Sequence, residues 1–235
     1  DDIAARNKSE LVCFAGGGHY DVYLPQTVKS LTMRPEFMTS YTPYQAEISQ
    51  GRLESLYNYQ NMISELTGLP VSNSSLLDEA TSAAEAVNMT INYHRGKRKK
   101  ILISKSLHPQ NIAVIKNRAK YQNIQICIQN EFEFKLDENI SSIVLQYPNT
   151  FGTIHDYTNI ISECKKKDIK IILITDLLAL CLLKSPKELN VDICVGNTQR
   201  FGVPLFPSQI TQPSGISVSS PDHINIVPLN VAKVS

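Results

Sequence analysis

Short apolar runs rich in Ile and Val, alternating with longer segments of helical pattern, constrain the fold of this chain most strongly. The runs occupy residues 101–104, 124–128, 143–147, 169–174 and 191–195, and helix-length segments occupy residues 110–121 and 157–166. Strands buried on both faces carry continuous apolar runs instead of alternating apolar and polar residues. The pattern therefore predicts an α/β fold, in which a mostly parallel sheet is flanked by helices.

Two further helices are expected before these runs. Apolar residues recur at three- and four-residue steps between 53 and 66, and Gly68 supplies a stop signal. Another helix is expected to begin near Asp78, because Ser75 and Asp78 have the spacing of a capping box and an alanine-rich stripe follows. These two helices are predicted to join the same α/β domain.

The charge balance does not favour nucleic acid or a membrane as a partner. The 235 residues include 23 basic and 22 acidic ones, so the net charge of +1 gives no electrostatic reason to expect binding to nucleic acid or to a membrane surface. No apolar run is long enough to cross a membrane. The dense basic run at residues 97–100 precedes an apolar run, and we expect it to be a solvated loop.

The cysteines carry no metal or disulfide pattern. Five of them are scattered singly, without a CxxC pair or the spacing of Cys and His ligands. We therefore expect neither a zinc site nor a disulfide scaffold, and a reducing compartment such as the cytoplasm is the simpler inference.

A polar and aromatic loop at residues 39–51, TSYTPYQAEISQG, leads directly into the first predicted helix. Pro43 fixes its own φ and biases Thr42 towards an extended conformation, so the loop backbone is stiff. Stiff polar loops suit recognition. Physical reasoning leaves two alternatives open: a recognition loop, or a surface turn whose tyrosines pack on the core.

Longer sequence motifs carry a family resemblance. They are the loop itself, GRLESL at 51–56, ELTGLP at 65–70, NSSLLDEAT at 73–81, HPQNIAV at 108–114, DLLAL at 176–180 and QRFGVP at 199–204. Together they closely resemble the glycine cleavage system P-protein, the glycine dehydrogenase (decarboxylating). The resemblance is to the amino-terminal half of that family, or to subunit 1 of its split form, and covers nearly everything from Phe14 to Leu205.

The resemblance implies the fold-type-I architecture of pyridoxal-phosphate enzymes. It places His108 where a histidine stacks on the cofactor ring, and Asp176 where an aspartate pairs with the pyridine nitrogen. Gln199 falls at the position of the Schiff-base lysine, and an amide nitrogen is too weak a nucleophile for that bond. His108 could instead be a loop or helix-start residue, and Asp176 could cap the following turn. We therefore regard all three positions as vestigial cofactor-site positions.

The first turn of the helix near Asp78 would lie by the cofactor phosphate in such an enzyme. Asp78 and Glu79 there would repel a phosphate, although free amides and the helix dipole attract anions. The two acids suit a helix cap better.

The family's amino-terminal half is implied to carry no cofactor of its own. It pairs with a pyridoxal-phosphate-bearing subunit 2 or carboxyl-terminal half, which decarboxylates glycine and passes the aminomethyl group to the lipoyl arm of H-protein. The expected contribution of this chain is a loop at the shared site, in the cytoplasm or, in a eukaryote, the mitochondrial matrix. Its candidate residues for contact with substrate or partner are Tyr41, Thr42, Tyr44, Gln45 and Glu47.

Three parts are expected along the chain: an arm and site loop at 1–48, an α/β large domain at 49–205 and a divergent tail at 206–235. After Pro204 the glycine-rich strand and smaller domain of the family are not recognisable, so the chain resembles a truncated subunit 1, a divergent paralogue or a fragment. A non-catalytic binding or regulatory protein therefore stays open as an alternative. So does a separate pyridoxal enzyme that uses Lys105 or Lys184.

Overall fold

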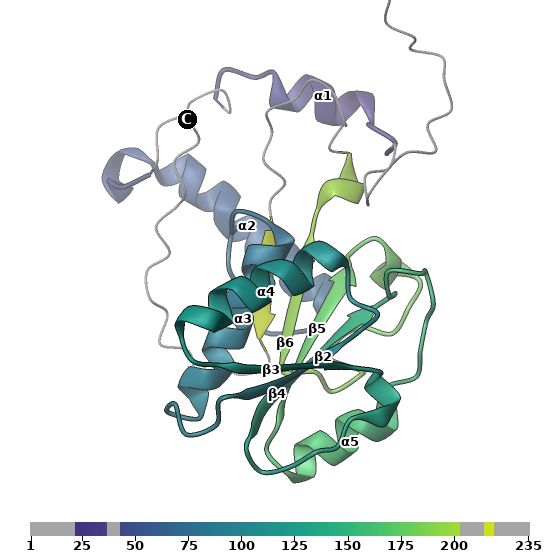
Figure 1. Cartoon of the computed structure of the whole chain (residues 1–235). Helices are drawn as coiled ribbons and strands as arrows, with labels where there is room; N and C mark the ends of the chain where they lie inside the picture. Colours follow the sequence, from purple (N-terminus) through teal and green to yellow (C-terminus); the bar gives the residue numbers. More distant parts are fainter. Residues whose placement is uncertain (1–21, 37–42, 203–213, 219–235) are drawn as a thin grey trace, which may run out of the picture.

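A single mixed sheet organises the part of the chain that the computed structural model describes, residues 22–36, 43–202 and 214–218. Its strand order is β1-β7-β6-β5-β4-β2-β3. Helices cover both faces of the sheet (Figure 1). The neighbours from β6 to β3 pair in parallel, and β7 and β1 extend the sheet through antiparallel pairings. The strands are β1 (Val71–Ser72), β2 (Lys100–Ser104), β3 (Gln125–Gln129), β4 (Ile140–Tyr147), β5 (Lys170–Asp176), β6 (Ile193–Asn197) and β7 (Ser214–Val218).

Each of the five apolar runs coincides with one of the strands β2 to β6, so the predicted α/β class with a mostly parallel sheet is confirmed. The helices are α1 (Gln26–Thr32), α2 (Gln50–Thr67), α3 (Glu79–Tyr93), α4 (Pro109–Tyr121) and α5 (Thr158–Lys166). The sheet also includes β7, which lies within the predicted tail; the domain boundary at residue 205 stays a prediction.

The core lies in two layers, one on each face of the sheet. In β5, Ile171 and Leu173 belong to the cluster that α5 covers, whereas Ile172 and Ile174 belong to the cluster beneath α3 and α4. Successive strand residues point to opposite faces, so a parallel sheet covered by helices on both faces needs apolar residues at every position. This requirement explains the continuous apolar runs in the sequence.

The helix α2 ends where the sequence predicts. Gly68 follows its last residue with φ of 71°, the left-handed conformation that glycine adopts without strain. A Cβ at this position would also lie 2.7 Å from Cβ of Lys187. Both the backbone angle and the close approach of Lys187 therefore favour glycine.

The start of α3 differs in detail from the prediction. The N-cap is Asp78, whose Oδ1 accepts a hydrogen bond from the backbone N–H of Thr81 at 2.6 Å. The expected capping box beginning at Ser75 is wrong, because Leu76 packs against the core before the helix begins. Asp78 is itself a strong N-cap residue, so the helix starts at the next residue.

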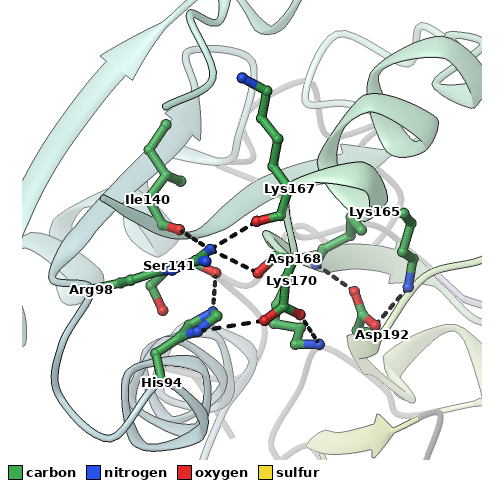
Figure 2. Close-up of polar contacts among 10 residues, drawn as sticks. His94, Arg98, Ile140, Ser141, Lys165, Lys167, Asp168, Lys170 and Asp192 are labelled. Carbon is green, nitrogen blue, oxygen red and sulfur yellow. Dashed lines mark hydrogen bonds and ion pairs between the residues drawn. The ribbon is translucent and has the colours of Figure 1, made fainter. Parts of the chain in front are cut away.

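At the amino-terminal edge of the parallel strands, Arg98 binds backbone carbonyls from two other elements (Figure 2). Its Nη1 donates to the carbonyl oxygens of Lys167 at 2.9 Å, Asp168 at 3.0 Å and Ile140 at 3.4 Å. The side chain thus joins the end of α5 to the start of β4. The prediction of a solvated loop at residues 97–100 is wrong for Arg98 and for Lys100, which is the first residue of β2, while Lys97 and Lys99 are exposed.

Other charges at this edge pair locally. Lys170 Nζ lies 2.8 Å from Asp168 Oδ1, and the His94 ring nitrogens lie 3.2 Å from the Ser141 carbonyl oxygen and 3.9 Å from Asp168 Oδ2 (Figure 2). Lys165 Nζ pairs with Asp192 Oδ1 at 2.6 Å. We refer to His94, Arg98, Asp168 and Lys170 as the amino-edge cluster.

Candidate functional site

The carboxyl ends of the parallel strands bring the predicted site positions to one edge of the sheet. Tyr147, Asp176 and Asn197 are the last residues of β4, β5 and β6, and His108 follows β2 after a short turn. Ligands of open α/β sheets bind at this edge. We therefore take the carboxyl edge as the candidate site.

Asp176 lies in this edge as a turn-capping residue. Its Oδ1 accepts hydrogen bonds from the backbone N–H groups of Leu178 at 2.9 Å and Ala179 at 3.4 Å. Its Oδ2 lies 3.5 Å from Nε of Arg200. These contacts are those of a residue that caps the following turn, which was the alternative role considered for Asp176 in the sequence.

His108 occupies the N-cap position of α4, but its imidazole makes no capping hydrogen bond. The backbone N–H of His108 donates to Gln146 Oε1 at 2.7 Å, and Pro109 takes the first helical position. Proline tolerates that position because its missing N–H would have no helical partner there. The helix start thus fixes the His108 backbone at the strand ends.

Gln199 is 7% exposed and begins the short helical turn η5 (Gln199–Phe201), directly after β6. Its backbone N–H donates to Asn197 Oδ1 at 3.2 Å. Its carboxamide is at the position that the family resemblance gives to the Schiff-base lysine, and it cannot supply that nucleophile.

Glu79 is the centre of a hydrogen-bond network that sequence reasoning missed. Its Oε1 accepts from Asn111 Nδ2 at 2.8 Å, and its Oε2 accepts from Asn197 Nδ2 at 2.5 Å. Burial raises the pKa of Glu79 above its ordinary value, and the two amide donors oppose that rise. These bonds join the starts of α3 and α4 to the end of β6. We call Glu79, Asn111 and Asn197 the Glu79 network.

The sequence shows the acidic residues of this network but not their partners. Two acids at the start of α3 are visible in it, but the asparagine partners lie 32 and 118 residues away. Without a tertiary structure nothing connects them.

The helix α2 closes one side of the candidate site. The hydroxyl of Tyr59 hydrogen bonds to the Thr198 side chain, next to Gln199. Ile63, Leu177 and Leu180 pack together beneath it. Burial raises the pKa of Tyr59, so this hydroxyl stays protonated at neutral pH.

The predicted loop residues lie elsewhere. Tyr44, Gln45 and Glu47 are exposed just before α2. The amino-terminal end of α2 is the end that lies farther from the sheet (Figure 1). Tyr44 is 68% exposed, and its neighbours form the short turn η2 (Ala46–Ile48). Tyr41 and Thr42 are outside the described residues. The described loop residues are thus available to another molecule.

A cavity of about 630 Å³ lies between the end of α2 and the segment before β6, lined by Glu65, Leu69 and Lys187 among others. None of the residues of the candidate site lines it. In the described ranges, no group of three or more His, Cys, Asp or Glu side chains could hold a metal ion, and no helix is long and apolar enough to span a membrane.

Solved structures define the class of fold. A cystathionine gamma-lyase from Lactobacillus plantarum matches with a TM-score of 0.58 at 14% identity, covering 80% of this chain and 50% of that one. A cysteine desulfurase from Escherichia coli matches with a TM-score of 0.57 at 13% identity, covering 84% of this chain and 51% of that one. The chain therefore has the fold-type-I large-domain architecture of pyridoxal-phosphate enzymes.

The family follows from closer matches. The profile of the glycine cleavage system P-protein matches residues 1–206. A structure of glycine decarboxylase (P-protein) in inhibitor-bound form matches with a TM-score of 0.82 at 31% identity, covering 92% of this chain and 50% of that one. The chain belongs to the glycine cleavage system P-protein family.

Curated relatives are much longer than this chain. The mitochondrial glycine dehydrogenase (decarboxylating) of Pisum sativum is 43% identical over 207 residues, 87% of this chain and 19% of the relative. The corresponding Dictyostelium discoideum protein is 46% identical over 205 residues, 86% of this chain and 20% of the relative. The chain thus spans about a fifth of the length of these relatives.

The residues at the candidate site do not fit a covalently held pyridoxal phosphate. Glu79 brings a carboxylate to the start of α3, where an anionic group would otherwise find the helix dipole. Gln199, at the position that the resemblance gives to the Schiff-base lysine, offers an amide and not an amine, and Asp176 is engaged by a turn and by Arg200.

Proposed function

We propose that this chain is the cofactor-free half of a glycine dehydrogenase (decarboxylating), which completes the active site of a partner that carries pyridoxal phosphate. The observation that carries the proposal is the combination of family membership with a strand-end site whose polar groups bind one another. The partner would decarboxylate glycine and pass the aminomethyl group to the lipoyl arm of H-protein. The chain alone would be inactive.

The relatives and the exposed apolar side chains support a partner region. The chain spans about a fifth of its relatives, so in a complete enzyme the other parts would lie in the same or another polypeptide. Apolar side chains on η2 and α2 are exposed in the described structure: Ile48 at 72%, Tyr57 at 62% and Met62 at 56%. Large apolar side chains that are this exposed are candidates for burial by a partner.

The loop residues Tyr41, Thr42, Tyr44, Gln45 and Glu47 would act in the partner's site. Hydroxyl and amide groups on this loop could bind glycine, the cofactor or the lipoyl arm. The exposure of Tyr44, Gln45 and Glu47, away from the chain's own strand ends, supports this role.

The relatives also suggest a cellular compartment for this chain. The relatives described above are named as mitochondrial proteins. For a eukaryotic source we propose the mitochondrial matrix, and for a bacterial source the cytoplasm.

A reconstitution assay tests the proposal. Exchange of carbon between bicarbonate and glycine is measured with H-protein and a subunit 2 preparation, with and without this chain. We expect exchange to require the chain, and Tyr44→Ala to reduce it. Tyr121→Ala is the matched control, because Tyr121 is 78% exposed on α4, outside the proposed interface.

Two outcomes would contradict the proposal. Exchange that does not depend on a folded chain would favour the non-catalytic binding or regulatory protein. Exchange that the chain supports without subunit 2 would favour a separate pyridoxal enzyme that uses Lys105 or Lys184.

A further inference from the structure

The strand β3 is the last strand on one side of the sheet. It pairs in parallel with β2 along its whole length, and among the described residues no strand pairs with its other edge. An edge strand presents unpaired N–H and C=O groups, which proteins commonly protect with lysines, prolines or bulges. The sequence of β3, QICIQ, has no charged residue and no proline, and its pairing with β2 has no register shift. In the described structure this edge is therefore open to pairing with another strand.

The backbone groups of Ile126 and Ile128 point to the open edge. Gln125 donates its N–H to the carbonyl oxygen of the residue just before β2 at 2.8 Å, and the Gln129 carbonyl accepts from the N–H of the residue just after β2 at 2.8 Å. These two residues thus point towards β2. Because successive residues of a strand direct their backbone groups to alternate sides, the N–H and C=O groups of Ile126 and Ile128 point away from β2.

The sequence of β3 also reads the same in both directions. In an antiparallel pair of identical strands centred on Cys127, Ile126 of one copy lies opposite Ile128 of the other. Gln125 lies opposite Gln129, and Cys127 lies opposite Cys127. No other antiparallel register pairs the whole strand. It brings outward N–H groups against outward carbonyls, so each pair of Ile126 with Ile128 exchanges both of its hydrogen bonds.

We propose that two copies of this chain associate through β3, which joins their sheets into one continuous sheet across a two-fold axis at Cys127. Two-fold interfaces of this kind use the same surface on both copies. The strand β3 is at the opposite end of the strand order from β1 and β7, which α2 contacts. The association is therefore separate from the interface proposed on η2 and α2.

The charges around β3 fit a pairing with a second copy. A charged residue in the strand would face a like charge or lose solvent across the axis, and β3 contains none. The nearest exposed charges along the chain are Lys120 before the strand and Glu133 after it. Antiparallel pairing brings the end of one copy that carries Lys120 beside the end of the other that carries Glu133. The two ends therefore have complementary charges.

Cys127 gives a specific mark of the two-fold axis. Its backbone groups point towards β2, so the Cys127 pair is of the non-hydrogen-bonded kind, in which the Cα atoms lie about 4.5 Å apart. That separation is within the range of a disulfide. The Cys127 side chain is partly exposed. When copper(II) phenanthroline is added, the two thiols release two protons, two copper(II) ions take one electron each, and an S–S bond forms.

The first test measures the oligomeric state of the purified full chain by sedimentation velocity over a range of concentrations. We expect a monomer–dimer equilibrium. Ile128→Pro removes an outward N–H and no hydrogen bond to β2, and edge strands tolerate proline at such positions. We expect it to weaken dimerisation at least about tenfold, a free-energy change of about 1.4 kcal/mol. The matched control is Ile128→Thr, which keeps the N–H and should dimerise like the unmodified chain.

Exchange of charges covers the case in which Ile128→Pro does not fold. Gln125 and Gln129 are both exposed, and the register places them opposite each other. Gln125→Lys combined with Gln129→Lys should give a monomer, and so should the corresponding pair of glutamates, because like charges oppose each other. A mixture of the two variants should form a heterodimer. Under oxidation the unmodified dimer should be linked through Cys127, and Cys127→Ser should abolish this link.

Three outcomes would overturn the inference. They are a chain that stays monomeric over the whole concentration range, a dimer that Ile128→Pro and both charged variants leave intact, and an oxidised dimer without linkage through Cys127. All of them concern the association of this chain with its own copy. They leave the exchange assay of the proposed function unaffected, so the two failures can be distinguished.

Discussion

The two edges of the parallel sheet use charged groups in opposite ways. At the amino edge, Arg98 donates to backbone carbonyls of a neighbouring segment, and Lys170 pairs with the carboxylate of Asp168. At the carboxyl edge, where α/β enzymes hold ligands, Glu79 accepts hydrogen bonds from two asparagine amides and Asp176 caps a turn. The difference indicates that charged groups at the amino edge hold backbone segments together, whereas polar groups at the carboxyl edge bind one another.

The largest effect is expected at the amino edge. Arg98→Ala would leave three carbonyl oxygens without their donor and lower the free energy of unfolding by about 2 kcal/mol, after allowance for solvent screening. For a chain of this size the thermal midpoint would fall by about 4–8 °C. Lys97→Ala, at an exposed neighbouring position, should change stability little. Equal losses in the two variants would show that Arg98 does not hold this edge.

A smaller effect is expected for Asp176 at the carboxyl edge. Asp176→Ala removes the acceptor for the N–H groups of Leu178 and Ala179, at a cost of about 1 kcal/mol in stability. Asp176→Asn keeps an acceptor oxygen and should lose less. Urea unfolding of both variants makes the comparison. A loss in Asp176→Asn as large as in Asp176→Ala would show that the charge, and not the cap, matters.

The smallest effect is a pH dependence at the amino edge. Burial lowers the pKa of His94 and Arg98 lowers it further, whereas Asp168 and the Ser141 carbonyl raise it. The folded chain therefore binds the proton less readily than the unfolded chain. Stability is retained above the ordinary value of 6.5 and falls as the pH decreases towards the lower folded pKa.

Urea unfolding at about pH 8 and about pH 5.5 checks this sign. His94→Gln, whose amide could still donate to the Ser141 carbonyl, should lose less stability between the two conditions. A larger loss in this variant than in the unmodified chain would contradict the assignment.

The sequence predicts the layout of the molecule better than its polar contacts. Apolar periodicity identifies β2 to β6, because burial on both faces of the sheet acts on every residue of a strand. Gly68 marks the end of α2 because a local backbone conformation demands it. Local rules of this kind can be recognised in a single chain.

The Glu79 network and the contacts of Arg98 could not be predicted in the same way. They join residues between 32 and 118 positions apart, so they depend on how the layers pack. The basic run at 97–100 shows the limit, since Arg98 and its exposed neighbour Lys97 have similar sequence surroundings but different roles. The roles proposed for His108, Gln199 and the loop residues remain predictions.

The central claim is that this chain holds no pyridoxal phosphate of its own. The most direct measurement is incubation of the purified chain with pyridoxal phosphate, reduction with borohydride and mapping of pyridoxyl-lysine by mass spectrometry. The account predicts no stoichiometric adduct at any single lysine, with subunit 2 labelled in a parallel reaction. A stoichiometric adduct at one lysine of this chain, such as Lys105 or Lys184, would contradict it.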